Sequence, residues 1–353
     1  MVKTFVNKII QNEKANYYLR RWLPIFVPSR NKRKMLRRQL YSQYTRHIIN
    51  ELVREKFPND YVFFSRAGVG DVFFAASLMK EFKKIHPGRV VYVTEKESIA
   101  DFLRSFPSID EVIYNPYLDG LQAVSYVQRP IATGQLNFLF FPYRGSNPNY
   151  VFADSYANLL GMPLNSVRET PILSPEDIQR ATQEFSKLHI TPQRTFILIP
   201  ECQMFKSSAL TPRFWQTLAT NLANRGFDVV FNSRNKAYQH FKTTFLPLNA
   251  FVAFASQAKH IFSFRSGIND FMVGMGITHL TAIYPNNMEV TWSDNFLFNE
   301  THNKYHIKTK ETELDNLMHI YSLSSNFNVN IDEIIYDELS EERLMEALLQ
   351  RIK

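Results

Sequence analysis

The 353-residue chain has little cysteine and no long apolar segment, and these shortages exclude several classes of protein. Cys202 is the single cysteine, so the chain can form neither an internal disulfide framework nor a cysteine-rich zinc site. No apolar run reaches the roughly 18 residues that a membrane-spanning helix needs. The N-terminus lacks an apolar stretch followed by a small-residue cleavage site, as a secretory signal would have. We therefore expect a protein of the reducing cytoplasm.

Positive charge is concentrated in the first 60 residues. The net charge is +8, and residues 1–60 hold 14 Lys and Arg against 4 Asp and Glu. Residues 17–27 are densely apolar and aromatic, and a basic run follows at 30–38. This pattern predicts a helical basic extension over 1–59. Its residues 1–57 either bind an anionic membrane surface, at the inner face of the plasma membrane, or pack on the fold with a solvated basic face. No aromatic-interleaved repeat supports nucleic-acid binding.

The segment 61–71, YVFFSRAGVGD, begins a regular alternation of strands and helices. Residues 61–64 predict a buried strand, Gly68 and Gly70 a turn, and residues 72–85 a helix that follows Asp71. Further strands are predicted at 90–94, 111–114 and 136–141, with helices at 99–106 and 155–160. This βαβ alternation is typical of a doubly wound parallel sheet, so we expect a Rossmann-like domain over 60–165.

The second half of the chain repeats the pattern after a linker at 166–193. Strands are predicted at 195–200, 228–231, 261–264 and 278–284, and helices at 211–224 and 251–258. A turn at 265–270 leads into a helix that ends near residue 276, and a last helix covers about 338–352. The fold class is therefore α/β, with a second Rossmann-like domain over 194–353.

Short motifs in both halves resemble those of one enzyme family. Gly70-Asp71-Val72, then His86-Pro87 and residues 107–113, resemble the N-terminal half of heptosyltransferase-like glycosyltransferases of family 9. In the second half, residues 199–200, Lys206, 212–215, 225–226, 266–267 and 284–285 are similar to that family's motifs in order and spacing. The resemblance covers roughly residues 60–290 and implies the GT-B architecture of two facing Rossmann-like domains.

The resemblance also implies roles for a few residues. Asp71 matches the acid that deprotonates the acceptor hydroxyl, and Lys206 approximately matches a basic residue that contacts the phosphate of the donor. The turn whose amides hold the diphosphate is matched by Ser266, Gly267 and Ile268. Two positions depart from the family: Arg265 stands where it has Asp, and Asp270 where it has His. These departures suggest a donor other than a heptose nucleotide, or another acceptor.

The chemistry of glycosyl transfer fits these residue types. A carboxylate can take the proton of the attacking hydroxyl, although Asp71 could equally serve to cap its helix. The helix N-terminus at Ser266 to Asn269 and the cations Arg265 and Lys206 could stabilise the leaving diphosphate. Alternatively, Arg265 pairs with Asp270 or Glu201, and Lys206 is a solvated loop residue. The sequence has no Asp-x-Asp, which metal-dependent transferases use, so we expect an inverting reaction without metal or cofactor.

Further cleft candidates follow predicted strands: Arg66, Gly68, Gly70, Tyr143, Arg144, Glu201 and Asp270. The expected substrates are a nucleotide-sugar and a surface polysaccharide or lipid-linked glycan. Two other functions stay open. A nicotinamide oxidoreductase is suggested by Gly68-x-Gly70 and by Glu95 at the end of the next strand, but Phe73 occupies the third glycine position. The other is a catalytically silent GT-B binding protein.

Overall fold

The computed structural model describes most of the two predicted domains. It describes residues 53–64, 68–116, 118, 130–139, 151–202, 205–206, 210–285, 289–290, 305–306, 322–336 and 341–352, with residues 18, 29 and 32. The predictions for most of the basic extension, and for Arg66, Tyr143 and Arg144, lie outside the described residues. None of the helices within these ranges has the length and hydropathy of a membrane span.

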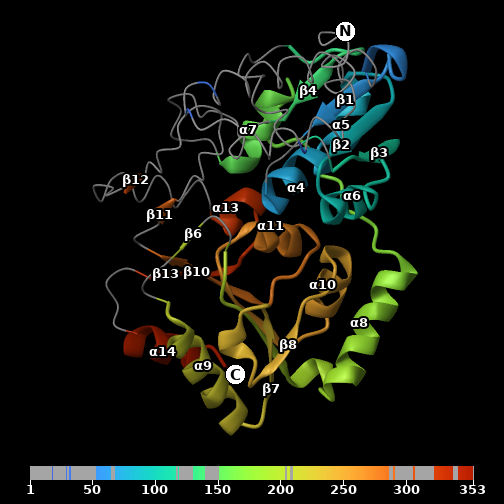
Figure 1. The fold of residues 1–353 in the computed structure, drawn as a ribbon. Helices are drawn as coiled ribbons and strands as arrows, with labels where there is room; N and C mark the ends of the chain where they lie inside the picture. Colours follow the sequence, from blue (N-terminus) through green and yellow to red (C-terminus); the bar gives the residue numbers. More distant parts are fainter. Residues whose placement is uncertain are drawn as a thin grey trace.

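The first domain is a parallel four-stranded sheet with helices on it (Figure 1). The strand order is β3-β2-β1-β4, formed by β1 (Tyr61–Phe64), β2 (Val90–Thr94), β3 (Glu111–Tyr114) and β4 (Leu136–Phe138). Its helices are α4 (Val69–Ser77), α5 (Met79–Ile85), α6 (Glu97–Leu103) and α7 (Phe152–Leu159). The helix predicted over 72–85 is divided in two at Leu78, and the strand predicted over 136–141 ends at Phe138.

The second domain is a parallel six-stranded sheet in the order β13-β10-β9-β5-β7-β8. The strands are β5 (Thr195–Ile199), β7 (Asp228–Asn232), β8 (Lys242–Thr244), β9 (His260–Phe264), β10 (Leu280–Pro285) and β13 (Asp332–Tyr336). The helices are α9 (Pro212–Asn224), α10 (Leu248–Ala255), α11 (Gly267–Gly274), α13 (Leu323–Phe327) and α14 (Glu341–Gln350). The short strands β6 (Phe205–Lys206), β11 (Glu289–Val290) and β12 (Tyr305–His306) form a separate antiparallel sheet.

Helix α8 (Pro175–Leu188) occupies the linker between the two domains. The Ser174 hydroxyl accepts a hydrogen bond from the Asp177 amide at 3.1 Å, and Pro175 takes the first helical position, as expected from the sequence. Phe185 of α8 stacks on Phe254 of α10 with ring centroids 4.2 Å apart. The helix is therefore packed against the second domain.

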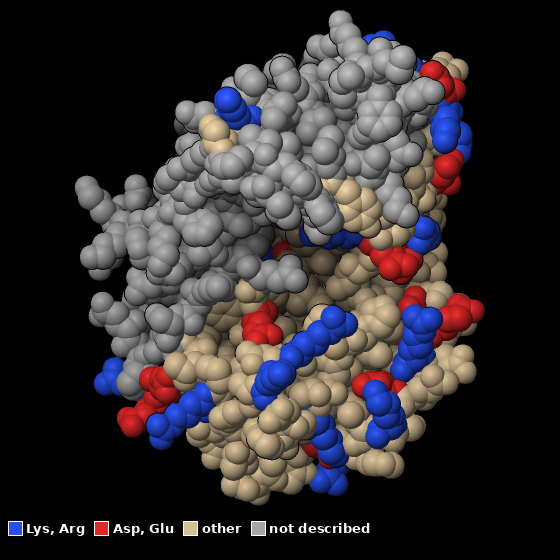
Figure 2. All heavy atoms as spheres, in the orientation of Figure 1, with Lys and Arg blue, Asp and Glu red and all other residues tan. Residues whose placement is uncertain are grey.

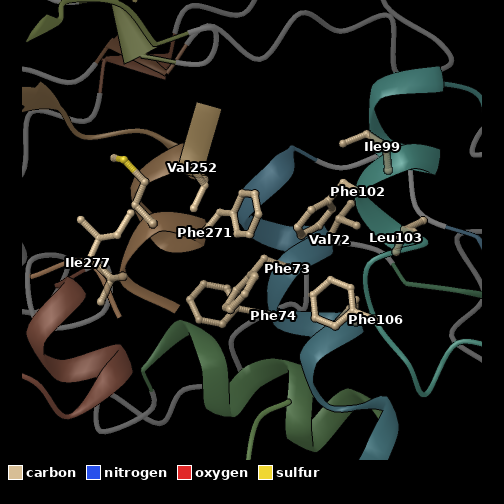
Figure 3. Packing of buried hydrophobic residues seen from close by; sticks show 14 of the residues in the cluster. Val72, Phe73, Phe74, Ile99, Phe102, Leu103, Phe106, Val252, Phe271 and Ile277 are labelled. Atoms are coloured by element: carbon tan, nitrogen blue, oxygen red, sulfur yellow. The ribbon is translucent and has the colours of Figure 1, made fainter. Parts of the chain in front are cut away.

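A single apolar core runs across the junction between the domains (Figure 3). Phe271 of α11 lies edge-on to Phe102 of α6, with centroids 4.6 Å apart, and 6.0 Å from Phe73 of α4. Phe74, also of α4, stacks on Phe327 of α13 with ring centroids 5.4 Å apart. Aromatic burial of this kind dominates the energetics of an interface, so the two sheets are held in one arrangement by their facing helices.

Candidate active site

Helices α4 and α11 begin at the carboxyl ends of parallel strands, one in each domain, and their first turns touch (Figure 1). A Cβ atom added to Gly267 would lie 2.6 Å from the backbone nitrogen of Gly70. One added to Gly70 would lie 2.4 Å from Oδ2 of Asp270 and 3.0 Å from Cα of Gly267. Only glycine allows backbones to approach this closely. The contact brings the two strand ends, where open α/β sheets bind ligands, to one place.

Asp71 lies in the first turn of α4, at this junction. Its Oδ2 accepts a hydrogen bond from the Gly68 amide at 3.1 Å, and its Oδ1 accepts one from the Tyr156 hydroxyl of α7 at 2.9 Å. Burial raises the pKa of Asp71 to about 6, and the nearby charge of Asp270 adds to this, while the two hydrogen bonds oppose it. The carboxylate thus caps α4, and its pKa lies closer to neutral pH than that of an exposed carboxylate.

Arg265 and Asp270 form a buried, bidentate ion pair. Nη1 of Arg265 lies 2.9 Å from Oδ2 of Asp270, and Nη2 lies 2.6 Å from Oδ1. Arg265 is 6% exposed and Asp270 3%. Although burial opposes it, Asp270 holds the pKa of Arg265 above its ordinary value. The pairing with Asp270, one of the two alternatives for Arg265, is present, and Glu201 is not its partner.

The turn predicted to bind the diphosphate is held by hydrogen bonds between its own residues. Oδ1 of Asn269 accepts from the Ser266 amide at 3.2 Å and from the Ser266 hydroxyl at 3.0 Å. Asn269 is fully buried, and Gly267 packs on Gly70. A diphosphate can reach the amides of Gly267 and Ile268 from the side of α4 only if the two glycines separate, so its binding here stays a prediction. A dinucleotide pyrophosphate at Gly70 would require the same separation, because the contact is mutual.

A series of polar contacts leads from the Arg265–Asp270 pair to α13 and α7. The Tyr284 hydroxyl contacts Arg265 and donates to Glu333, whose carboxylate accepts from the Leu323 amide at 2.7 Å. The Ala153 amide of α7 donates to Oδ1 of Asn326 in α13 at 2.8 Å. Helix α7, which carries the Tyr156 hydroxyl that holds Asp71, is therefore bonded directly to the second domain.

Comparison of this chain with known proteins found similarity to solved structures only. No protein-family model matches the chain, and no curated protein does. A glycosyl transferase family 9 protein from Veillonella parvula aligns with a TM-score of 0.50 and 15% identity, over 84% of this chain and 91% of that one. The ADP-heptose lps heptosyltransferase II of E. coli aligns with a TM-score of 0.52 and 11% identity, over 82% and 98%.

The chain has the GT-B fold of these two proteins. At such low identity the likeness concerns the fold alone, and it confirms the architecture predicted from the paired motifs. In this GT-B chain, Asp71 comes from the first domain and the Arg265–Asp270 pair from the second. The space-filling view shows a hollow on one face, bordered by side chains of both charges (Figure 2).

The other predicted residues lie away from the junction of α4 and α11 or outside the described part of the chain. Glu201 is exposed after β5, and its carboxylate accepts from Ser233 and from Asn235, each at 2.8 Å. The backbone of Lys206 pairs with Glu289 in the small sheet, and its side chain is outside the described part. Sequence reasoning missed Tyr156 and Arg168, and it gave Tyr284 no role although Tyr284-Pro285 belongs to one of the matched motifs. No local motif marks Tyr156 or Arg168, because they reach the junction through the packing of separate elements.

The glycine contact makes a direct prediction about stability. Gly267→Ala is expected to lower the stability by about 1–3 kcal/mol, since the new methyl group meets backbone atoms that cannot rotate away. The matched control is Gly68→Ala, whose Cβ would lie 3.4 Å from Oδ2 of Asp71 in ordinary contact. Thermal unfolding of both variants tests this. Equal midpoints for the two would mean that α4 and α11 are not packed as described.

Proposed function

We propose that this protein is a glycosyltransferase that moves a sugar from a nucleotide-diphosphate donor to a glycan acceptor, with inversion, without metal, and with Asp71 as general base. The observation that carries the proposal is the carboxylate of Asp71. It lies at the carboxyl end of a parallel strand, at the junction of two GT-B domains, and its pKa is raised to about 6. Strongly shifted acids in such places are typical of catalytic sites.

The proposed reaction needs one proton transfer and one displacement. Asp71 takes the proton of the acceptor hydroxyl, whose oxygen attacks the anomeric carbon while the bond from that carbon to the diphosphate breaks. With a pKa near 6, Asp71 is largely ionised at pH 7 to 8 and is still more basic than an exposed carboxylate, which is the favourable range for general base catalysis. Inversion follows because no protein nucleophile takes part.

The leaving diphosphate needs positive charge or free amides. We assign this role to Lys206 and to the turn Ser266 to Asn269, through the amides of Gly267 and Ile268, because the amides of Ser266 and Asn269 already donate within the turn. Because Asp270 already neutralises Arg265, this arginine would act mainly by fixing the turn and the position of Asp270. Arg265 and Asp270 stand where the resembling family has other residues, so the donor sugar need not be a heptose.

The acceptor we propose is a surface polysaccharide or a lipid-linked glycan, reached at the inner face of the plasma membrane through residues 1–57. This segment carries an aromatic patch beside a basic run, which suits an anionic surface. Deleting residues 1–57 is expected to reduce binding to vesicles that contain anionic lipid, most strongly at low salt. Unchanged cosedimentation with these vesicles would remove the membrane proposal and leave the rest intact.

The donor is best identified by a thermal-shift screen of the full-length protein against UDP-, GDP-, ADP- and CMP-linked sugars. A specific donor should raise the unfolding midpoint at concentrations above its Kd, because it binds the folded state alone. Release of the nucleoside diphosphate is then followed in the presence of glycan acceptors. Stabilisation by NAD, and by none of the nucleotide-sugars, would contradict the proposed function.

A further inference from the structure

An exposed aromatic ring with an arginine stacked on it lies at the carboxyl end of the second sheet. Phe245 follows β8 directly and is 55% exposed. The guanidinium of Arg234, which comes two residues after β7, lies over this ring with Cζ 3.9 Å from the ring centroid. Because the arginine covers one face of the ring and more than half of the side chain is exposed, the other face is accessible to a ligand.

The carboxylate of Glu201 lies beside this pair and is held in a fixed orientation. Its Oε2 accepts a hydrogen bond from the Ser233 hydroxyl, and its Oε1 accepts one from Nδ2 of Asn235, each at 2.8 Å. Ser233 and Asn235 flank Arg234 in the chain, so the carboxylate and the stacked ring belong to one cluster. Glu201 is exposed, and each of its oxygens keeps a second acceptor position for the hydroxyls of a ligand.

We propose that Phe245 and Arg234 form a platform on which the nucleobase of the donor stacks, and that Glu201 accepts hydrogen bonds from the hydroxyls of its ribose. Proteins stack bases on aromatic rings and on arginine planes, and a carboxylate can accept from two neighbouring hydroxyls. Every base has a flat face, so we expect the platform to accept several bases and the ribose to carry the selectivity. That the nucleotide carries a sugar rests on the proposed function.

The order of these residues along the sheet matches the order of the parts of a nucleoside diphosphate. The strands run β9-β5-β7-β8 across the sheet. The turn assigned to the diphosphate follows β9, Glu201 follows β5, and the platform follows β7 and β8. Neighbouring strands lie about 4.8 Å apart, so the platform is roughly 10 to 14 Å from the turn, with Glu201 between them. Diphosphate, ribose and base would thus meet their partners in sequence.

The cluster lies at the end of the second domain that faces the first. Helix α10 begins three residues after Phe245, and Nδ2 of Asn249 in this helix donates to the carbonyl oxygen of Asp101 in α6 at 3.5 Å. A donor bound in this direction has its base at the margin of the domain junction. Its diphosphate and sugar then lie nearer to the first turns of α4 and α11, where Asp71 is located.

The platform is tested by calorimetric binding of ADP and of pyrophosphate to the full-length protein. Phe245→Ala is expected to weaken ADP binding by about 5- to 100-fold, as the loss of one stacked base predicts, and to leave pyrophosphate binding unchanged. Phe245→Tyr keeps the ring and should bind ADP like wild type. The matched control is Tyr114→Ala, which removes a 39% exposed aromatic side chain at the end of β3 in the first domain. Equal ADP affinities for wild type and Phe245→Ala would overturn the platform.

The ribose contact is tested by combining a variant with a modified ligand. Glu201→Gln is expected to weaken ADP binding about tenfold, because a hydrogen bond to a charged group is weakened. Wild type should lose a similar factor when 2′-deoxy-ADP replaces ADP, whereas Glu201→Gln should lose much less, since the charged partner of that hydroxyl is already gone. The same loss in both proteins would show that Glu201 does not contact the ribose.

The outcomes also separate this site from the proposed function. If nucleotide-sugars bind and react while Phe245→Ala and Glu201→Gln bind ADP like wild type, the nucleoside lies elsewhere and the transferase proposal stands. If wild type binds UDP but not ADP, a platform that accepts several bases is contradicted. If wild type binds neither nucleoside diphosphates nor nucleotide-sugars, both proposals fail together.

Discussion

Replacing Asp71 with asparagine is expected to lower kcat for sugar transfer by about 100- to 10,000-fold, the usual contribution of a general base. Asparagine has nearly the same shape, and its one side-chain oxygen can accept from either Tyr156 or Gly68, which bond to different oxygens of Asp71, but it cannot take a proton from the acceptor. The assay is release of nucleoside diphosphate in the presence of acceptor. The matched control is Asp101→Asn, which changes an exposed carboxylate on α6 of the same domain.

Stability measurements separate this loss from a folding defect. The pKa of Asp71 is higher in the folded chain, about 6, than its ordinary value of 3.8. Its ionisation therefore costs folding free energy as pH rises through this range. At pH 8, Asp71→Asn should unfold at the same temperature as wild type or above it, and the difference should vanish below pH 4. An Asp71→Asn variant that transfers sugar at the wild-type rate would show that the base lies elsewhere.

Replacing Arg265 with methionine is expected to cost about 3–5 kcal/mol of stability, the typical loss when one partner of a buried ion pair is removed. The Asp270 carboxylate would remain 3% exposed without its bidentate partner. The double variant Arg265→Met/Asp270→Asn should recover much of the loss, because the unpaired charge is then gone. Chemical unfolding of the single and double variants measures both effects.

The exposed pair of Arg104 and Asp101 provides the control for this experiment. Nη1 of Arg104 lies 2.6 Å from Asp101, yet both side chains are more than half exposed. Solvent screens such a pair, so Arg104→Met should cost less than about 1 kcal/mol. A loss for Arg265→Met no larger than that for Arg104→Met would mean that Arg265 and Asp270 are not a buried pair.

Much of the fold was predictable because its central strands are continuous apolar runs. Strands β1, β2, β5 and β9 are buried almost completely, and such runs indicate parallel strands covered on both faces. The strands β8 and β13 were missed. They form the two edges of the second sheet and include polar residues such as Lys242 and Asp332, so they lack that pattern.

The candidate site was only partly predictable, because only some of its residues belong to a recognisable local sequence pattern. Asp71 follows a strand and a glycine turn, which is a local signal. Tyr156 and Arg168 have none, because their proximity to α4 depends on how α7 and the linker pack. The 30 phenylalanines are unusually many for the chain length, but only the structure shows that several of them fill the junction between the domains.

The central claim, that Asp71 is the base at this junction, is tested most directly by the pH dependence of kcat/KM for wild type and for Tyr156→Phe. For the wild type the rate should fall as pH decreases through about 6, the pKa of Asp71. The Tyr156 hydroxyl lowers that pKa, so Tyr156→Phe should move the midpoint to higher pH. A rate that stays constant between pH 5 and 8, or a midpoint that is the same in both proteins, would contradict the account.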